Sequence, residues 1–111
     1  MNNKYIAILI NAEKNIIDEV EYSDFEDIQN LIGCDTFCLG TDLSNGDTLY
    51  VDDEGLLKQT KHGFYFNNRL FVGNGLVCGT DAEGDNQDVQ SRIGEIERMV
   101  EFLPFGDQVS Y

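Results

Sequence analysis

The chain is poor in positive charge, and this shortage excludes two classes of partner. Lys and Arg total 7 against 21 Asp and Glu among 111 residues, so the formal net charge is −14. A protein that binds DNA or RNA directly places cations against phosphates, and this chain has too few to offset its own repulsion of a polyanion. The same imbalance disfavours an anionic membrane surface. We therefore expect no direct contact with nucleic acid or with a membrane.

Long apolar runs and paired cysteines are also lacking. No stretch approaches the roughly 20 apolar residues of a membrane-spanning helix, and no small-residue cleavage site follows the first apolar run. The chain has three cysteines, Cys34, Cys38 and Cys78, so a disulfide framework would leave one thiol unpaired. Reduced thiols in a cytoplasmic protein are the simpler expectation.

The apolar residues that a folded core requires are nevertheless present. Hydrophobic residues make up 41% of the chain, with 7 Phe and 5 Tyr. Disordered acidic chains lack the aromatic and branched residues that offset the entropy of ordering. Because the length suits a single core, we predict one acidic α+β domain over residues 1–111.

Hydrophobic patterning predicts the strands of this domain. The apolar run at residues 5–10 is typical of a central strand buried on both faces, and residues 16–22 form its expected hairpin partner. Residues 35–42 and 48–53 are predicted as strands joined around Asn45-Gly46, where both turn residues would supply positive φ angles. A second hairpin at 64–66 and 70–72 and a strand at 76–80 complete a small antiparallel sheet of about five or six strands.

Two helices are expected to pack on this sheet. Ser23 and Glu26 form a capping-box pattern at the start of a helix near residues 24–32, and Gly33 suits the left-handed position that ends it. A C-terminal helix that ends at Pro104 is predicted by apolar residues at alternating steps of four and three. These residues are Val89, Ile93, Ile96, Val100 and Leu103.

Metal sites and other cofactors are not predicted. If Asp81 were the first position of an EF-hand loop, Asn86 would take the glycine position and Arg92 the twelfth. The acidic segment 81–88 is therefore expected to be a solvated loop. Zinc is disfavoured because the three cysteines and His62 do not form two closely spaced pairs.

Catalytic motifs are missing as well. A nucleophilic triad would have to use His62, the one histidine, and no Gly-x-Ser-x-Gly elbow surrounds a serine. Gly73, Gly75 and Gly79 resemble a phosphate-binding fingerprint only loosely, since no helix pattern follows them. We expect a protein that is not an enzyme.

The excess of carboxylates favours a protein-binding function. A folded chain of this length has a diameter of roughly 34 Å and would lie beside about twenty phosphates of a DNA duplex. The 21 acids match that number, so the charge predicts a decoy for a basic groove, provided that the acids gather on one side or in a homodimer. Solubility alone is the structural alternative. The expected surface comprises Asp18, Glu19, Glu21, Asp52, Asp53, Glu54, Asp81, Glu83, Asp85 and Asp88.

A cluster of cations supports a second hypothesis, a small-ligand-binding protein. Three of the seven cations and the one histidine lie within twelve residues, at Lys58, Lys61, His62 and Arg69. They could hold a small anion such as a nucleotide immune signal, with stacking by Phe64 or Tyr65. Pairing of these cations with neighbouring carboxylates is the structural alternative.

Three segments of the chain resemble those of a known family. They are residues 28–33 (IQNLIG), 49–58 (LYVDDEGLLK) and 70–77 (LFVGNGLV). They resemble small proteins of phages and bacterial mobile elements that share the domain of unknown function 3846. The resemblance implies a compact α+β domain in a phage or mobile-element setting and brings no catalytic residues. We therefore expect an accessory protein in the cytoplasm of a bacterial host. It would inhibit a host protein with a basic nucleic-acid-binding surface, in the manner of an anti-restriction or anti-CRISPR inhibitor.

Overall fold

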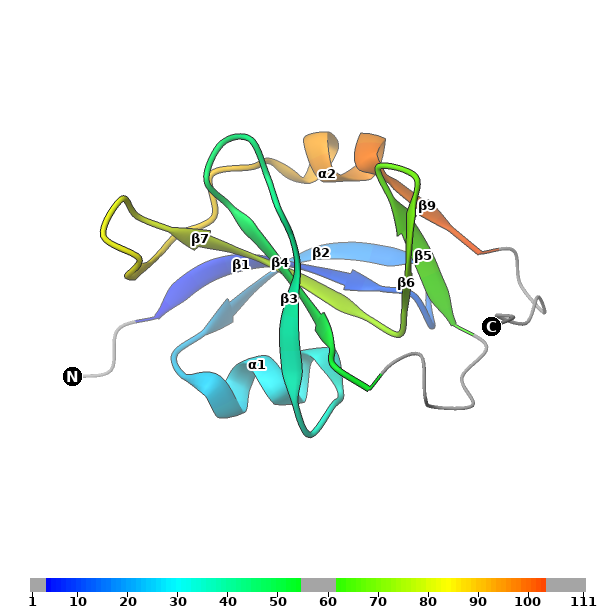
Figure 1. The fold of residues 1–111 in the computed structure, drawn as a ribbon, viewed down its shortest axis with the longest axis horizontal. Coiled ribbons are helices and arrows are strands. Elements are labelled where there is room, and N and C mark those ends of the chain that lie inside the picture. The colour runs from blue at the N-terminus through cyan, green and yellow to red at the C-terminus, as the bar shows by residue number, and fades with distance from the viewer. Residues whose placement is uncertain (1–3, 55–61, 104–111) are drawn as a thin grey trace.

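The computed structural model describes residues 4–54 and 62–103, which form two antiparallel sheets and two helices (Figure 1). The larger sheet has the strand order β2-β1-β7-β4-β3, with β8 paired to β7, and the smaller sheet has the order β6-β5-β9. The predicted α+β class is confirmed, as is a main antiparallel sheet of five to six strands. The separate smaller sheet was not predicted.

The larger sheet is built from the predicted hydrophobic segments, with ends that differ by one or two residues. Its strands are β1 Tyr5–Asn11, β2 Ile16–Tyr22, β3 Phe37–Asp42, β4 Thr48–Asp52, β7 Gly75–Thr80 and β8 Asn86–Gln87. Strand β8 corrects the prediction of a loop over residues 81–88. Its two polar residues give no hydrophobic signal, and β8 exists because Gly79 and Thr80 pair with Gln87 and Asn86.

Side chains of β1 alternate between two cores, which explains why the run IAILI is apolar without a break. Ile8 and Ile10 enter the core that β5, β6 and α2 (Ile93–Met99) cover. Ala7 enters the core beneath α1 (Phe25–Ile32). Figure 1 shows α1 and α2 on opposite faces of the larger sheet.

The smaller sheet consists of β5 Gly63–Phe66, β6 Arg69–Val72 and β9 Val100–Phe102. Asn67 and Asn68 both have positive φ, 48° and 71°, as a two-residue hairpin turn requires. The predicted second hairpin is confirmed. Phe64, Phe66 and Phe71 of this hairpin are buried against the larger sheet.

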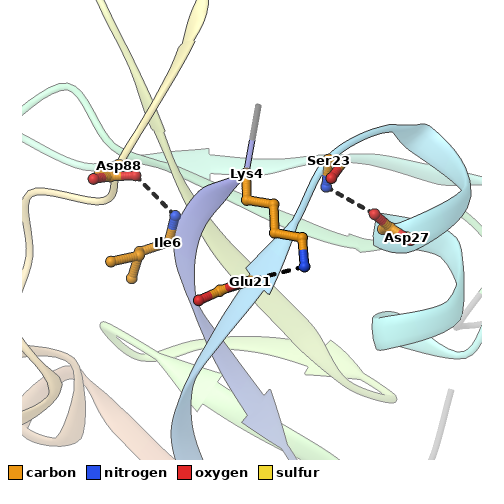
Figure 2. Close-up of polar contacts among 6 residues, drawn as sticks. All are labelled: Lys4, Ile6, Glu21, Ser23, Asp27 and Asp88. Carbon is orange, nitrogen blue, oxygen red and sulfur yellow. Dashed lines mark hydrogen bonds and ion pairs between the residues drawn. The ribbon is translucent and has the colours of Figure 1, made fainter. Parts of the chain in front are cut away.

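Helix α1 has the predicted end but a different start. Gly33 has φ 82° and ends the helix as predicted. The start is shifted by one residue, because Asp24, not Ser23, is the N-cap and accepts a hydrogen bond from the Asp27 N–H at 3.0 Å. Asp27 in turn accepts from the Ser23 N–H at 2.7 Å (Figure 2). An extended Asp24 presents its own short carboxylate to the helix, so the Ser23–Glu26 capping box is not needed.

Helix α2 is shorter than the predicted C-terminal helix. It begins after Arg92 and ends at Met99. Val89 lies outside it because the backbone N–H of Val89 donates to the Ile6 carbonyl at 2.8 Å. Val100 lies outside it because β9 pairs with β5. The apolar residues that suggested a longer helix are divided among the segment before α2, α2 itself, and β9 with the residue that follows it.

Asp47 closes the β3–β4 turn and is fully buried. Its Oδ2 accepts from the Ser91 N–H and the Ser91 hydroxyl, both at 2.7 Å, and its Oδ1 accepts from the Gln90 N–H at 3.0 Å. Of the predicted turn pair, only Gly46 has positive φ, at 95°. The turn is therefore not the tight Asn-Gly type, and its function is to place Asp47 beneath the segment that leads into α2.

Candidate functional site

The strand register brings several acidic segments to one end of the larger sheet. Tyr22, the last residue of β2, pairs with Tyr5 at the start of β1. Thr48, the first residue of β4, pairs with both Cys78 near the end of β7 and Asp42 at the end of β3. Strand β1 also pairs antiparallel with β7, with Ile10 opposite Gly75, so the segments that follow β2, β7 and β3 leave the sheet at the same end.

Besides the buried Asp47, nine carboxylates occupy this region, which we call the acidic end. They are Glu21, Asp24, Glu26, Asp27, Asp42, Asp81, Glu83, Asp85 and Asp88. Seven are exposed, and Asp27 and Asp81 are half-buried. Among the described residues, two cations lie in or next to the segments that carry these carboxylates. Lys4 directly precedes β1, and Arg92 follows Ser91, whose N–H donates to Asp47. The acidic end thus carries a large local excess of negative charge.

Carboxylates also fix the backbone of the acidic end. Asp88 Oδ1 accepts from the Ile6 N–H at 2.9 Å and ties the segment after β8 to β1 (Figure 2). Asp81 Oδ1 accepts from the Glu83 and Asp85 N–H groups, both at 2.9 Å, and shapes the β7–β8 turn. The acidic end is therefore arranged before any partner arrives, which lowers the ordering cost of binding.

One ion pair connects the acidic end to a cation within the described ranges. Lys4 Nζ lies 3.9 Å from Glu21 Oε2, and the two side chains are 67% and 62% exposed (Figure 2). Such an exposed pair contributes little and is screened by salt. Lys4 is therefore a weak competitor for a partner's cations.

A polar cleft of about 540 Å³ opens at the acidic end. Asp42 and Asp81 line it together with Asn45, Thr48, Gln87 and Gln90. The lining offers carboxylate, amide and hydroxyl oxygens, which suit an ammonium or guanidinium group.

The structure brings together only part of the predicted protein-binding set. Glu21 and the four predicted acids of segment 81–88 lie at the acidic end. Asp18 and Glu19 lie in the middle of β2, and as neighbours on a strand they point to opposite faces.

The predicted cluster at Asp52, Asp53 and Glu54 lies at the other end of the sheet. Val51 pairs with Gly75, the first residue of β7, whereas segment 81–88 follows the last residue of that strand. The three predicted clusters therefore do not form one surface. The acids of α1 and Asp42 join the acidic end instead, and sequence spacing missed them because strand register brings them there.

The residues of the alternative ligand-binding hypothesis are arranged differently from the expectation. Lys58 and Lys61 lie outside the described residues. Phe64 is fully buried and has no surface for stacking on a ligand, while Tyr65 is exposed. Arg69 Nη1 donates to the Gly40 carbonyl at 3.0 Å, and its guanidinium lies 5.2 Å from the centre of the Phe71 ring. Arg69 is thus engaged within the fold.

A second cavity, of about 290 Å³, adjoins Arg69. Its lining includes Cys38, Asp52 and Asp53. Two carboxylates beside a single guanidinium disfavour a phosphate in this cavity.

Cys34, Cys38 and Cys78 form no disulfide with one another, and the thiols of Cys38 and Cys78 are not activated. Burial raises the pKa of the Cys78 thiol to about 12. Burial, followed by the neighbouring Asp53, raises the pKa of the Cys38 thiol above its usual value. Both thiols are protonated at neutral pH, where a nucleophile or metal ligand would need the thiolate. Within the described part of the chain, no three His, Cys, Asp or Glu side chains gather in a group that could hold a metal ion.

Comparison with known proteins finds one family. The model of the domain of unknown function DUF3846 matches residues 3–101. Searches of curated proteins and of solved structures find no match. In the described residues, neither helix has the length and apolar character needed to cross a membrane.

Proposed function

The chain belongs to the family of the domain of unknown function DUF3846, and we propose that it is a phage or mobile-element protein that inhibits a host defence protein. In this proposal it acts in the bacterial cytoplasm by binding, not catalysis. Its carboxylates occupy the cationic groove in which the host protein holds nucleic acid. An anti-restriction or anti-CRISPR inhibitor fits this description.

The density of charge at the acidic end carries the proposal. Five strands at a spacing of about 4.8 Å give the larger sheet a width of about 19 Å. A DNA duplex carries about eleven phosphates over that length. The nine carboxylates of the acidic end are of similar number, so a groove shaped for a duplex meets a comparable charge.

Fixed geometry and weak internal neutralisation also support this function. Asp81 and Asp88 hold the β7–β8 turn and the segment after β8 in place. Lys4, the cation paired with Glu21, is itself exposed. A partner's Lys and Arg side chains can therefore pair with these carboxylates without first breaking buried ion pairs, and the complex should weaken as salt rises.

A DNA-displacement assay tests this function. Purified restriction enzymes and CRISPR effectors are loaded with fluorescent DNA, and the protein is titrated in. For the true target we expect competitive release of DNA, with an apparent affinity that falls at least about tenfold between 50 mM and 200 mM salt. A target that binds DNA and this protein at the same time, or with an affinity independent of salt, would contradict mimicry.

A further inference from the structure

Strand β2 forms one edge of the larger sheet. It pairs with β1 along all seven of its residues, and among the described residues no strand pairs with its other side. An edge strand presents a row of N–H and C=O groups that can pair with another extended chain. The β1–β2 register runs without a shift from Tyr22 to Ile16, so this edge is regular over its whole length.

The opposite edge, β3, is interrupted by an irregularity in its pairing, whereas the β1–β2 pairing is not. A shift in register between Leu39 and Thr41 interrupts the β3–β4 pairing, and the carbonyl of the intervening Gly40 accepts a hydrogen bond from Arg69. Bulges and covering side chains are the usual means by which proteins block strand addition. Strand β2 has no bulge, no proline and no lysine.

The charges of β2 determine which chain it can accept. Asp18, Glu19 and Glu21 are all exposed. If β2 paired antiparallel with β2 of a second copy, the residue at the centre of the pairing would face itself. A centre at residue 18 would place Asp18 opposite Asp18, and a centre at residue 19 would place Glu19 opposite Glu19. Pairing about residue 20 would place Glu19 opposite Glu21. Because like charges directly opposite one another are destabilising, self-pairing is disfavoured and a cationic strand is favoured.

We propose that β2 docks an extended segment of the cationic partner as an added strand of the larger sheet. This inference rests on the proposed function and identifies how the partner is held. Glu19 and Glu21 lie on one face about 6.6 Å apart, so they match Lys or Arg at positions i and i+2 of the added strand. Backbone hydrogen bonds supply affinity, and the carboxylates select the sequence. Glu21 also belongs to the acidic end, so the edge and the acidic end form one continuous surface.

A pair of designed peptides tests the strand addition without a known target. One peptide alternates Lys with Val over seven residues, and the other replaces every Lys with Glu. With the Lys peptide we expect slowed hydrogen exchange at those β2 amides that face away from β1, measured by NMR. The Glu peptide is expected to leave exchange unchanged.

Matched charge reversals locate the contact. The variant E19K/E21K should bind the Lys peptide about tenfold more weakly and gain affinity for the Glu peptide. The variant D35K/E54K makes the same change in net charge at exposed positions near the opposite end of the sheet, and should change the affinity less than about threefold. Retained cooperative urea unfolding confirms that both variants fold.

Three results would overturn strand docking: no binding of the Lys peptide, binding without protection of β2 amides, or equal effects of the two charge reversals. Failure of the proposed function gives a different pattern. If the E19K/E21K variant still displaces DNA in a salt-dependent manner, β2 is not the docking element, but the protein is still an inhibitor. If the Lys peptide protects β2 amides but the protein displaces DNA from no defence protein, the strand-docking site stands and the proposed inhibitor function is rejected.

Discussion

Replacing Asp47 by alanine is expected to lower the free energy of unfolding by about 3 kcal/mol, because several buried hydrogen bonds are lost together. Asp47 has no exposed surface, and its carboxylate accepts from the Ser91 N–H, the Ser91 hydroxyl and the Gln90 N–H. Alanine would leave these donors without their acceptor. Urea unfolding followed by circular dichroism measures the change.

Two comparisons separate this network from a general effect of charge. Ser91→Ala removes only the hydroxyl and should cost about 1 kcal/mol. Glu54→Gln removes a negative charge at an exposed position and should change stability by less than about 0.5 kcal/mol. A D47A variant within about 1 kcal/mol of the natural protein would show that the carboxylate does not hold the β3–β4 turn to the segment before α2.

Neutralising three exposed carboxylates of the acidic end is expected to weaken the partner complex about thirtyfold, or about 2 kcal/mol. The variant is E26Q/E83Q/D85N, which draws on both α1 and the β7–β8 turn and spares Asp81 and Asp88, whose carboxylates hold the backbone. The midpoint of DNA displacement from the target protein measures the change. The salt dependence of the affinity should also become shallower, because fewer counterions are exchanged.

A variant with the same change in net charge provides the control. E13Q/D35N/E54Q removes three exposed carboxylates from the opposite end of the sheet and should weaken the complex less than about threefold. Equal losses in the two triple variants would mean that only net charge matters. Such a result would reject the acidic end as the contact surface.

The fold was predictable wherever one local signal dominates. The run IAILI predicted a central strand because β1 is buried on both faces, and Gly33 predicted the end of α1 because it takes the positive φ that ends the helix. Where tertiary contacts decide, the prediction failed. Val100 continues the helical spacing of α2, yet it is in β9 because β5 offers it a strand partner. Likewise, β8 depends on pairing with β7 and has no apolar pattern of its own.

The candidate site was only partly predictable for a related reason. Glu21 and Asp88 are distant in the sequence, and both lie beside Ile6 only because β2 pairs with β1 and Asp88 bonds to the Ile6 N–H (Figure 2). Conversely, the Asp52–Glu54 cluster consists of acids alone but lies at the opposite end of the sheet from segment 81–88. Composition predicts an excess of carboxylates, whereas strand register determines where they gather.

The distribution of surface potential can be measured directly and without a known partner. Paramagnetic relaxation of backbone protons by a cationic and by an anionic nitroxide, compared at each residue, reports the local potential near the surface. We expect the cationic probe to be enriched most strongly at the β7–β8 turn, the first turn of α1 and the end of β2, and less at residues 52–54. Equal enrichment around the whole molecule would mean that the carboxylates serve solubility alone and that no acidic contact surface exists.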